Sequence, residues 1–140
     1  MSPEPQVWPD EAVALQAKFF SGLANPVRLG IVLQLLDGER SVGELVRSLG
    51  VSQGHVSNQL ACLRWCGYVS SLRAGRQTRY FLRDDRVRAI VELGRAVLAD
   101  NAEHVQACTR IAPVDAAERR PGVGRAREGR VGEGTGHAST

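Results

Sequence analysis

The chain has 140 residues, of which 43% are hydrophobic, enough for one domain with a modest core and two tails. No run approaches the ~18 apolar residues of a membrane span, and the N-terminus lacks the features of a secretory signal, so we expect a cytoplasmic protein without a membrane partner. The formal net charge is +3, but residues 45–83 contain six arginines and no Asp or Glu. This block of one sign favours a nucleic-acid partner.

Both ends of the chain are poor in residues that could be buried. Residues 1–9 contain three prolines, and we expect a flexible arm there. Residues 109–140 are rich in Gly and Arg, a composition typical of disorder. The folded domain is therefore predicted to occupy residues 10–108.

Two helices are predicted at the start of this domain. Apolar residues recur at helical spacing over 10–21. Asn25 followed by Pro26 combines an N-cap residue with a proline at the first helical position, which is a strong helix start. The second helix is predicted to stop at Asp37 and Gly38.

A second pair of helices follows, joined by a tight turn. Ser41 and Glu44 have the spacing of a capping box, which opens a short helix that ends near Gly50. Ser52 is placed to cap the next helix, which is predicted to run to about Cys66. A short helix, a tight turn and a longer helix are the elements of a helix-turn-helix.

Beyond these helices the apolar residues no longer follow the spacing of a helix. Residues 68–73 and 77–82 are short β-prone runs separated by a glycine-containing turn, which predicts a hairpin. A long amphipathic helix is predicted from Asp84 or Asp85 to about Ala107. The predicted fold is mostly α with a small β-hairpin, a winged helix-turn-helix.

The sequence resembles the ArsR/SmtB family of metal-responsive repressors. The matching stretches are LANPVRLGIVLQLLDGE, SVGELVRSLGVSQGHVSNQLACLRWCGYV and GRQTRYFL, which follow the family's order and span roughly 12–108. One departure is Gln59, where members usually carry His. The resemblance implies a homodimer whose first and last helices pair across a two-fold axis. Such a dimer would bind double-stranded operator DNA with an inverted repeat.

On a helical wheel, Val56, Leu60 and Leu63 share the core face of the predicted DNA-reading helix. The opposite face carries amides, hydroxyls and small residues that suit the major groove. The arginines of the hairpin are expected to hold phosphates or to reach a minor groove, and His55 is treated as a phosphate or base contact. The predicted DNA-binding residues are Ser52, Gln53, His55, Ser57, Asn58, Arg64, Arg73, Arg76 and Arg79.

Two of the three cysteines, Cys62 and Cys66, lie four residues apart on the same helix and are therefore neighbours on one face. The wheel places them on a flank, away from both the core and the DNA face. In a reducing compartment such thiols favour metal binding or thiol chemistry over a structural disulfide. The alternative is that they are small buried hydrophobic residues.

The stretch LACLRWCGYV resembles the CmtR-like branch of the family, which senses cadmium and lead. The resemblance implies that Cys62 and Cys66 bind the metal together with Cys108 from the other subunit. Three thiolates without an imidazole favour Cd²⁺ or Pb²⁺ as the effector. Zn²⁺ would prefer a fourth ligand, for which His104 is the candidate. The implied function is a repressor that leaves its operator when the metal binds.

Two other functions remain open from the sequence. The first is a thiol redox-sensing repressor on the same fold, in which the neighbouring cysteines are oxidised. The second is a winged-helix module that binds a protein, although the basic, acid-free stretch argues against it. An enzyme is not expected, because His55, His104 and His137 have no evident nucleophile or carboxylate arrangement around them.

Overall fold

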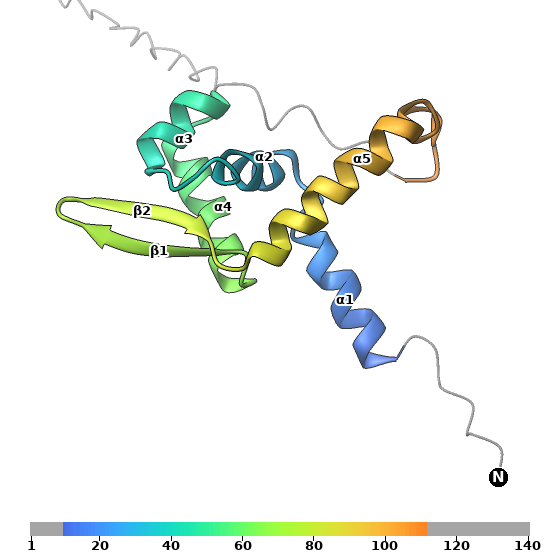
Figure 1. The fold of residues 1–140 in the computed structure, drawn as a ribbon, viewed down its shortest axis with the longest axis horizontal. Helices are drawn as coiled ribbons and strands as arrows, with labels where there is room; N and C mark the ends of the chain where they lie inside the picture. The colour runs from blue at the N-terminus through green and yellow to red at the C-terminus, as the bar shows by residue number, and fades with distance from the viewer. Residues whose placement is uncertain (1–9, 112–140) are drawn as a thin grey trace, which may run out of the picture.

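The computed structural model describes residues 10–111 and confirms a winged helix-turn-helix (Figure 1). The predicted arm at 1–9, and residues 112–140 of the tail predicted over 109–140, lie outside the described residues. Within 10–111 no helix is long and apolar enough to cross a membrane. The elements in chain order are α1 (Glu11–Ser21), α2 (Pro26–Leu35), α3 (Val42–Leu49), α4 (Gln53–Trp65), β1 (Val69–Ala74), β2 (Gln77–Leu82) and α5 (Asp85–Ala107).

The helix starts follow from their caps. The Asn25 side chain accepts hydrogen bonds from the backbone N–H groups of Val27 and Arg28 at the start of α2. Ser41 and Glu44 form the predicted capping box of α3. These bonds satisfy backbone donors that have no partner within the helix, which is why such residues fix a helix start.

Two predicted boundaries differ slightly from the structure. Helix α2 ends at Leu35, about two residues before the predicted stop. In the hairpin, Ala74 pairs with Gln77, so the turn has only two residues, and β1 begins and ends one residue later than predicted. Gly75 in this turn has a φ of 62°, a conformation that glycine adopts without strain.

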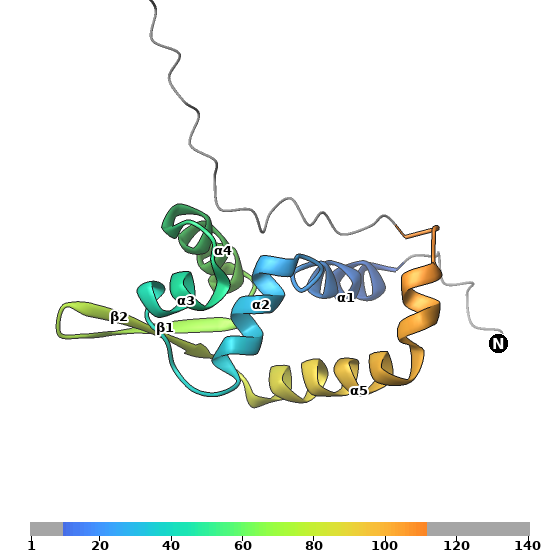
Figure 2. The same cartoon turned by 90° about the horizontal axis from the view of Figure 1, so that it is seen from above.

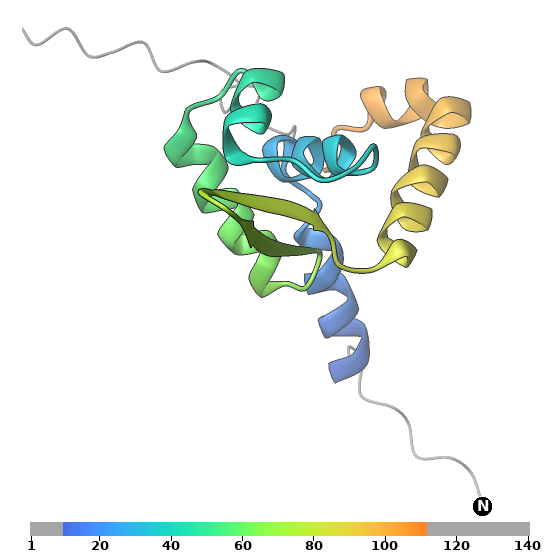
Figure 3. The ribbon, with the colours of Figure 1, turned by 60° about the vertical axis from the view of Figure 1, so that its left-hand side comes forward.

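The core lies between α2, α3, α4 and the base of the hairpin, and Figure 3 shows the hairpin crossing beside α4. The predicted core face of α4 is confirmed, because Val56, Leu60 and Leu63 are each at most 1% exposed. Burial of this stripe turns the opposite face of α4 outward. The largest fully buried side chains are Tyr68, Ile31, Leu45, Leu60, Leu63, Val32, Val56 and Val69.

Helices α1 and α5 project from the core on the side opposite the hairpin tip (Figure 2). Helix α1 has no buried residue, and α5 buries only Val87 and Val91 near its start. Much of their apolar surface is left uncovered, which is typical of an interaction surface. The large exposed apolar residues of these two helices are Leu15, Phe20, Leu93, Val97, Leu98 and Val105.

The C-terminal end of α1 is held by Tyr68, which follows α4. The Tyr68 hydroxyl donates a hydrogen bond to the carbonyl of Phe19, and the two rings stack with centroids 4.7 Å apart. Burial raises the pKa of Tyr68 to about 12, so the hydroxyl keeps the proton that it donates. Gly22, at the end of α1, lies directly against the Tyr68 ring.

We predict that Gly22→Ala destabilises the fold. A Cβ at Gly22 would lie 2.8 Å from Cε2 of Tyr68, so the ring or the end of α1 must shift, at a cost of ~1–3 kcal/mol. Gly54→Ala is the matched control, because a Cβ there meets no atom within 4 Å and alanine favours the helix. Urea unfolding at one protomer concentration measures both variants. Equal stability of the two variants would contradict the packing described for Gly22.

Candidate DNA-binding surface and thiol pair

The outer face of α4 is the first part of the candidate surface. Gln53, Ser57, Asn58 and Arg64 are all exposed there, as the helical wheel predicts. The Ser52 hydroxyl is exposed but also accepts a hydrogen bond of 3.2 Å from the backbone N–H of His55, so it caps the helix. This outer face of α4 takes no part in core packing. The DNA contacts of its residues stay predictions.

The three arginines of the hairpin differ in their surroundings. Arg73 and Arg76 are exposed near the tip. Arg79 instead bonds to the carboxylates of Glu39 and Glu44, at 3.3 and 3.0 Å, and its side chain is only 23% exposed. The bond from Arg79 lowers the pKa of the Glu44 carboxyl, which keeps the pair charged. We therefore expect Arg79 to hold the hairpin against α3, while its predicted phosphate contact stays untested.

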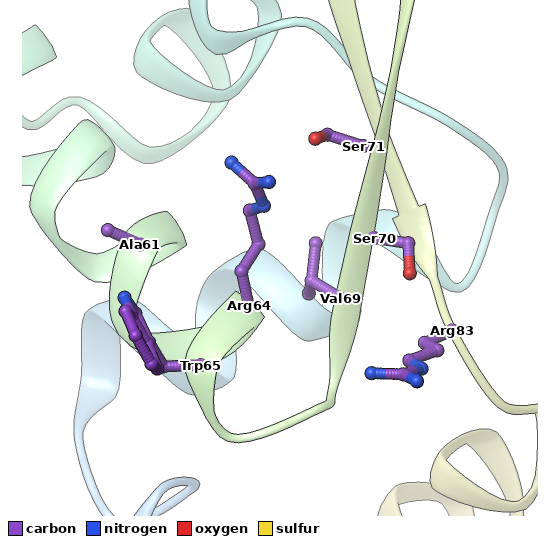
Figure 4. Close-up of a pocket in the computed structure, with 7 residues that line it drawn as sticks. All are labelled: Ala61, Arg64, Trp65, Val69, Ser70, Ser71 and Arg83. Atoms are coloured by element: carbon purple, nitrogen blue, oxygen red, sulfur yellow. The ribbon is translucent and has the colours of Figure 1, made fainter.

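A groove of about 470 Å³ runs between α4 and β1 (Figure 4). Arg64 and Arg83 line it, and Trp65 at its edge is 89% exposed. In the view of Figure 4, Ser71 of β1 points to the side of Arg64 and Ser70 to the side of Arg83. Such donors suit the oxygens of a phosphate backbone. Of the lining residues, only Arg64 was predicted to contact DNA. The groove is lined by Ala61, Arg64, Trp65, Val69, Ser70, Ser71 and Arg83.

The thiols of Cys62 and Cys66 lie next to each other at the C-terminal end of α4. Cys62 is half-buried, Cys66 is exposed, and both are free. Burial raises the pKa of the Cys66 thiol, and the neighbouring Cys62 adds to this effect by its charge and by a hydrogen bond. A metal ion that binds both sulfurs must therefore displace a proton from Cys66. Two adjacent thiols on one helix fit a soft metal ion.

Cys108 is the exposed C-cap residue of α5, the last helix of the protomer. Backbone hydrogen bonds from Ile111 and Arg110 lower the pKa of its thiol. Within the described part of the chain, no three His, Cys, Asp or Glu side chains lie close enough to hold one ion. One protomer thus brings Cys62 and Cys66 together but does not place Cys108 or His104 beside them.

Comparisons with known proteins agree with this architecture. The family model for "Bacterial regulatory protein, arsR family" matches residues 25–71. A "Probable mercury resistance operon repressor" of Streptomyces lividans is 47% identical over 68% of this chain and 76% of the relative. The "HTH-type transcriptional regulator CmtR" of Mycobacterium bovis is 41% identical over 73% of this chain and 87% of the relative.

Among solved structures, the chain is similar to the homodimeric winged helix-turn-helix DNA-binding domain of Mb0332 from Mycobacterium bovis. The TM-score is 0.61, with 28% sequence identity over 66% of this chain and 86% of that domain.

We predict that Arg76→Ala weakens binding to all DNA sequences. Loss of one phosphate contact should lower the slope of log affinity against log salt by about one unit. Arg86→Ala is the control, because Arg86 is an exposed arginine that bonds to Asp84 away from the hairpin tip. Fluorescence anisotropy at several salt concentrations gives both slopes. A slope for Arg76→Ala equal to that of the unmodified protein would remove Arg76 from the interface.

For Asn58→Ala we predict a loss of discrimination, because the exposed amide is placed to pair with base edges. Its affinity for operator DNA should fall by ~1–3 kcal/mol, with little change for random DNA. Competition of the two DNAs in one titration measures the ratio of affinities. If that ratio matched the unmodified protein, the outer face of α4 would be assigned wrongly.

Proposed function

This chain belongs to the ArsR family of bacterial regulatory proteins and is a transcriptional regulator, and we propose that it represses its operator as a homodimer until a soft metal ion binds its thiols. One observation carries the metal response. Cys62 lies on α4 and Cys66 is the C-cap residue of α4, so the adjacent thiols sit at the end of the helix whose outer face is predicted to read DNA. Any change at these sulfurs acts directly on the position of that helix.

The homodimer is supported by the exposed apolar residues of α1 and α5. The core of one protomer leaves both helices largely uncovered, so a second copy offers the matching surface. The similar Mb0332 domain is homodimeric. A two-fold dimer presents two copies of α4 in opposite directions, and an inverted-repeat operator is the DNA that matches this symmetry.

The metal site is proposed to consist of Cys62, Cys66 and the partner subunit's Cys108. Two sulfurs come from one helix, and Cys108 lies at the end of α5, one of the two helices proposed to pair in the dimer. Three thiolates suit Cd²⁺ or Pb²⁺. His104, in the last turn of α5, would supply the fourth ligand that Zn²⁺ prefers.

Hg²⁺ is a second candidate effector. Within the described residues, one protomer brings together only the two thiols of Cys62 and Cys66, and Hg²⁺ is soft enough to be held by two sulfurs. The relative from Streptomyces lividans carries mercury resistance in its name. Parallel titrations of the protein–DNA complex with Cd²⁺, Pb²⁺ and Hg²⁺ rank the three ions by the concentration at which each releases the DNA.

The response follows from the position of the thiols. Cys62 and Cys66 lose their protons when they bind the ion, and the segment that carries Cys108 is drawn towards the end of α4. A small rotation or shift of α4 then spoils contacts at base edges, because these depend on hydrogen-bond geometry. A coupling free energy of ~1–3 kcal/mol would weaken DNA binding about 5- to 150-fold.

A thiol redox switch is the remaining alternative on this fold. Peroxide could oxidise the two neighbouring thiols, and the resulting disulfide would distort the last turn of α4. Loss of DNA binding with peroxide, together with indifference to metal ions, would favour this function. Absence of any salt-dependent DNA binding would favour a protein-interaction module instead.

We predict that Cys62→Ser binds operator DNA as the unmodified protein does but no longer releases it with Cd²⁺. The hydroxyl is similar in size to the thiol and is a poor ligand for soft ions. Cys108→Ser tests the third ligand and should weaken the response while two sulfurs remain. The measurement is DNA anisotropy during a Cd²⁺ titration of the reduced variants. Full release of Cys62→Ser by Cd²⁺ would contradict the proposed site.

A further inference from the structure

The thiol pair is part of a longer polar stripe along α4. His55, Gln59, Cys62 and Cys66 follow one another at intervals of four, three and four residues, so their side chains lie along one edge of the helix. His55, Gln59 and Cys62 are all half-buried. The stripe runs from the first turn of α4, near the predicted DNA contacts, to its C-terminal end.

Arg28 of α2 lies beside the middle of this stripe. Its Nε donates to the carbonyl of Gly22 at 2.7 Å, and its Nη2 donates to the carbonyl of Ser21 at 3.2 Å. Its Nη1 donates to Oε1 of Gln59 at 3.0 Å. One guanidinium therefore holds the end of α1 and the middle of α4 at once, with the planar set of donors that only arginine offers.

The connection continues towards the DNA-reading end of the helix. Nε2 of Gln59 lies 3.5 Å from Nε2 of His55, a weak hydrogen bond when the ring nitrogen accepts. In the other direction, the positive charge of Arg28 acts on Cys66 and lowers the pKa of its thiol, against the larger effect of burial. Arg28 is thus within electrostatic reach of the thiol pair while bonded to Gln59.

We infer that Arg28 and Gln59 are positioning residues that transmit the state of the thiol pair to His55 and to the end of α1. This inference rests on the proposed metal response. Gln59 lies about one turn before Cys62 on the same edge of α4, so a shift of the last turns of the helix when the sulfurs bind an ion moves Gln59 relative to Arg28. The bond between Arg28 and Gln59 then weakens, Gln59 no longer holds the His55 ring in place, and Arg28 holds the Ser21 carbonyl less firmly.

The test compares Gln59→Leu with the unmodified protein. Leucine has a similar size but neither accepts from Arg28 nor donates to His55. The quantity measured is the ratio of DNA dissociation constants with and without saturating Cd²⁺. We expect this ratio to fall at least ~5-fold in the variant, a loss of most of a typical coupling. The sulfur-to-cadmium absorption band should keep its intensity and stoichiometry, because both cysteines are present.

Two controls separate a transmitting role from a merely structural one. Gln77→Leu makes the same chemical change at an exposed position of β2 and should leave the ratio unchanged. Gln59→His keeps a polar acceptor for Arg28 and should restore much of the ratio. In NMR spectra, the ring signals of His55 should shift when Cd²⁺ is added to the unmodified protein and stay in place in Gln59→Leu.

The outcomes distinguish this inference from the function on which it rests. An unmodified protein that ignores Cd²⁺ overturns both. A responsive unmodified protein with an equal ratio in Gln59→Leu overturns the inference alone. Should Gln59→Leu fail to fold, Arg28→Lys replaces it, since lysine keeps the charge but loses the three directed bonds. For Arg28→Lys we expect the same fall in the ratio of DNA dissociation constants, and an unchanged ratio again overturns the inference.

Discussion

Burial of one face of α4 is the constraint on which the rest of this structure depends. Val56, Leu60 and Leu63 are almost completely removed from solvent, so the rotation of the helix about its axis is fixed by the core. Since the helical period is fixed as well, every other position on α4 receives its direction from this packing. Asn58 is turned outward, and Cys62 is held on the flank.

This arrangement explains how one helix can serve two purposes without conflict. The outward face is free of core packing, while Gln59 on the flank bonds to Arg28 of α2. Tyr68, which follows α4, bonds to Phe19 near the end of α1. A metal ion bound on the flank, as proposed, would not block the DNA face directly. It would act by changing how the helix is held, which is the kind of coupling that the proposed regulation needs.

The protomer also shows why a second copy matters. Its core lies between α2, α3, α4, the base of the hairpin and the start of α5, and α1 is attached mainly through its C-terminal end. The apolar residues left exposed on α1 and α5 need a partner surface to be stabilised. The proposed dimer would supply it and would bring the end of a neighbouring α5 within range of the thiol pair.

Much of the fold could be predicted from the sequence, because caps and hydrophobic periods are local signals. Asn25 and the Ser41 capping box mark helix starts within a few residues. The pairing of Arg79 with Glu39 spans 40 residues of sequence, and the contact of Arg28 with Gln59 spans 31. Such contacts depend on how elements approach in space, and no local pattern contains that information.

The groove beside Trp65 was missed for the same reason, since its lining comes from α4, β1 and the residue after β2. In the proposed dimer, the position of Cys108 relative to the thiol pair would depend on a second chain, so no pattern within a single chain predicts it. The outward direction of Asn58 and the flank position of Cys62 were predictable, because they follow from helical geometry alone.

The most direct test of the central claim is fluorescence anisotropy of reduced protein on its own labelled promoter DNA, titrated with Cd²⁺. Our account predicts tight, salt-dependent binding that is lost at about one metal ion per protomer. Tight binding that persists unchanged through saturating Cd²⁺, Pb²⁺ and Hg²⁺ would contradict it.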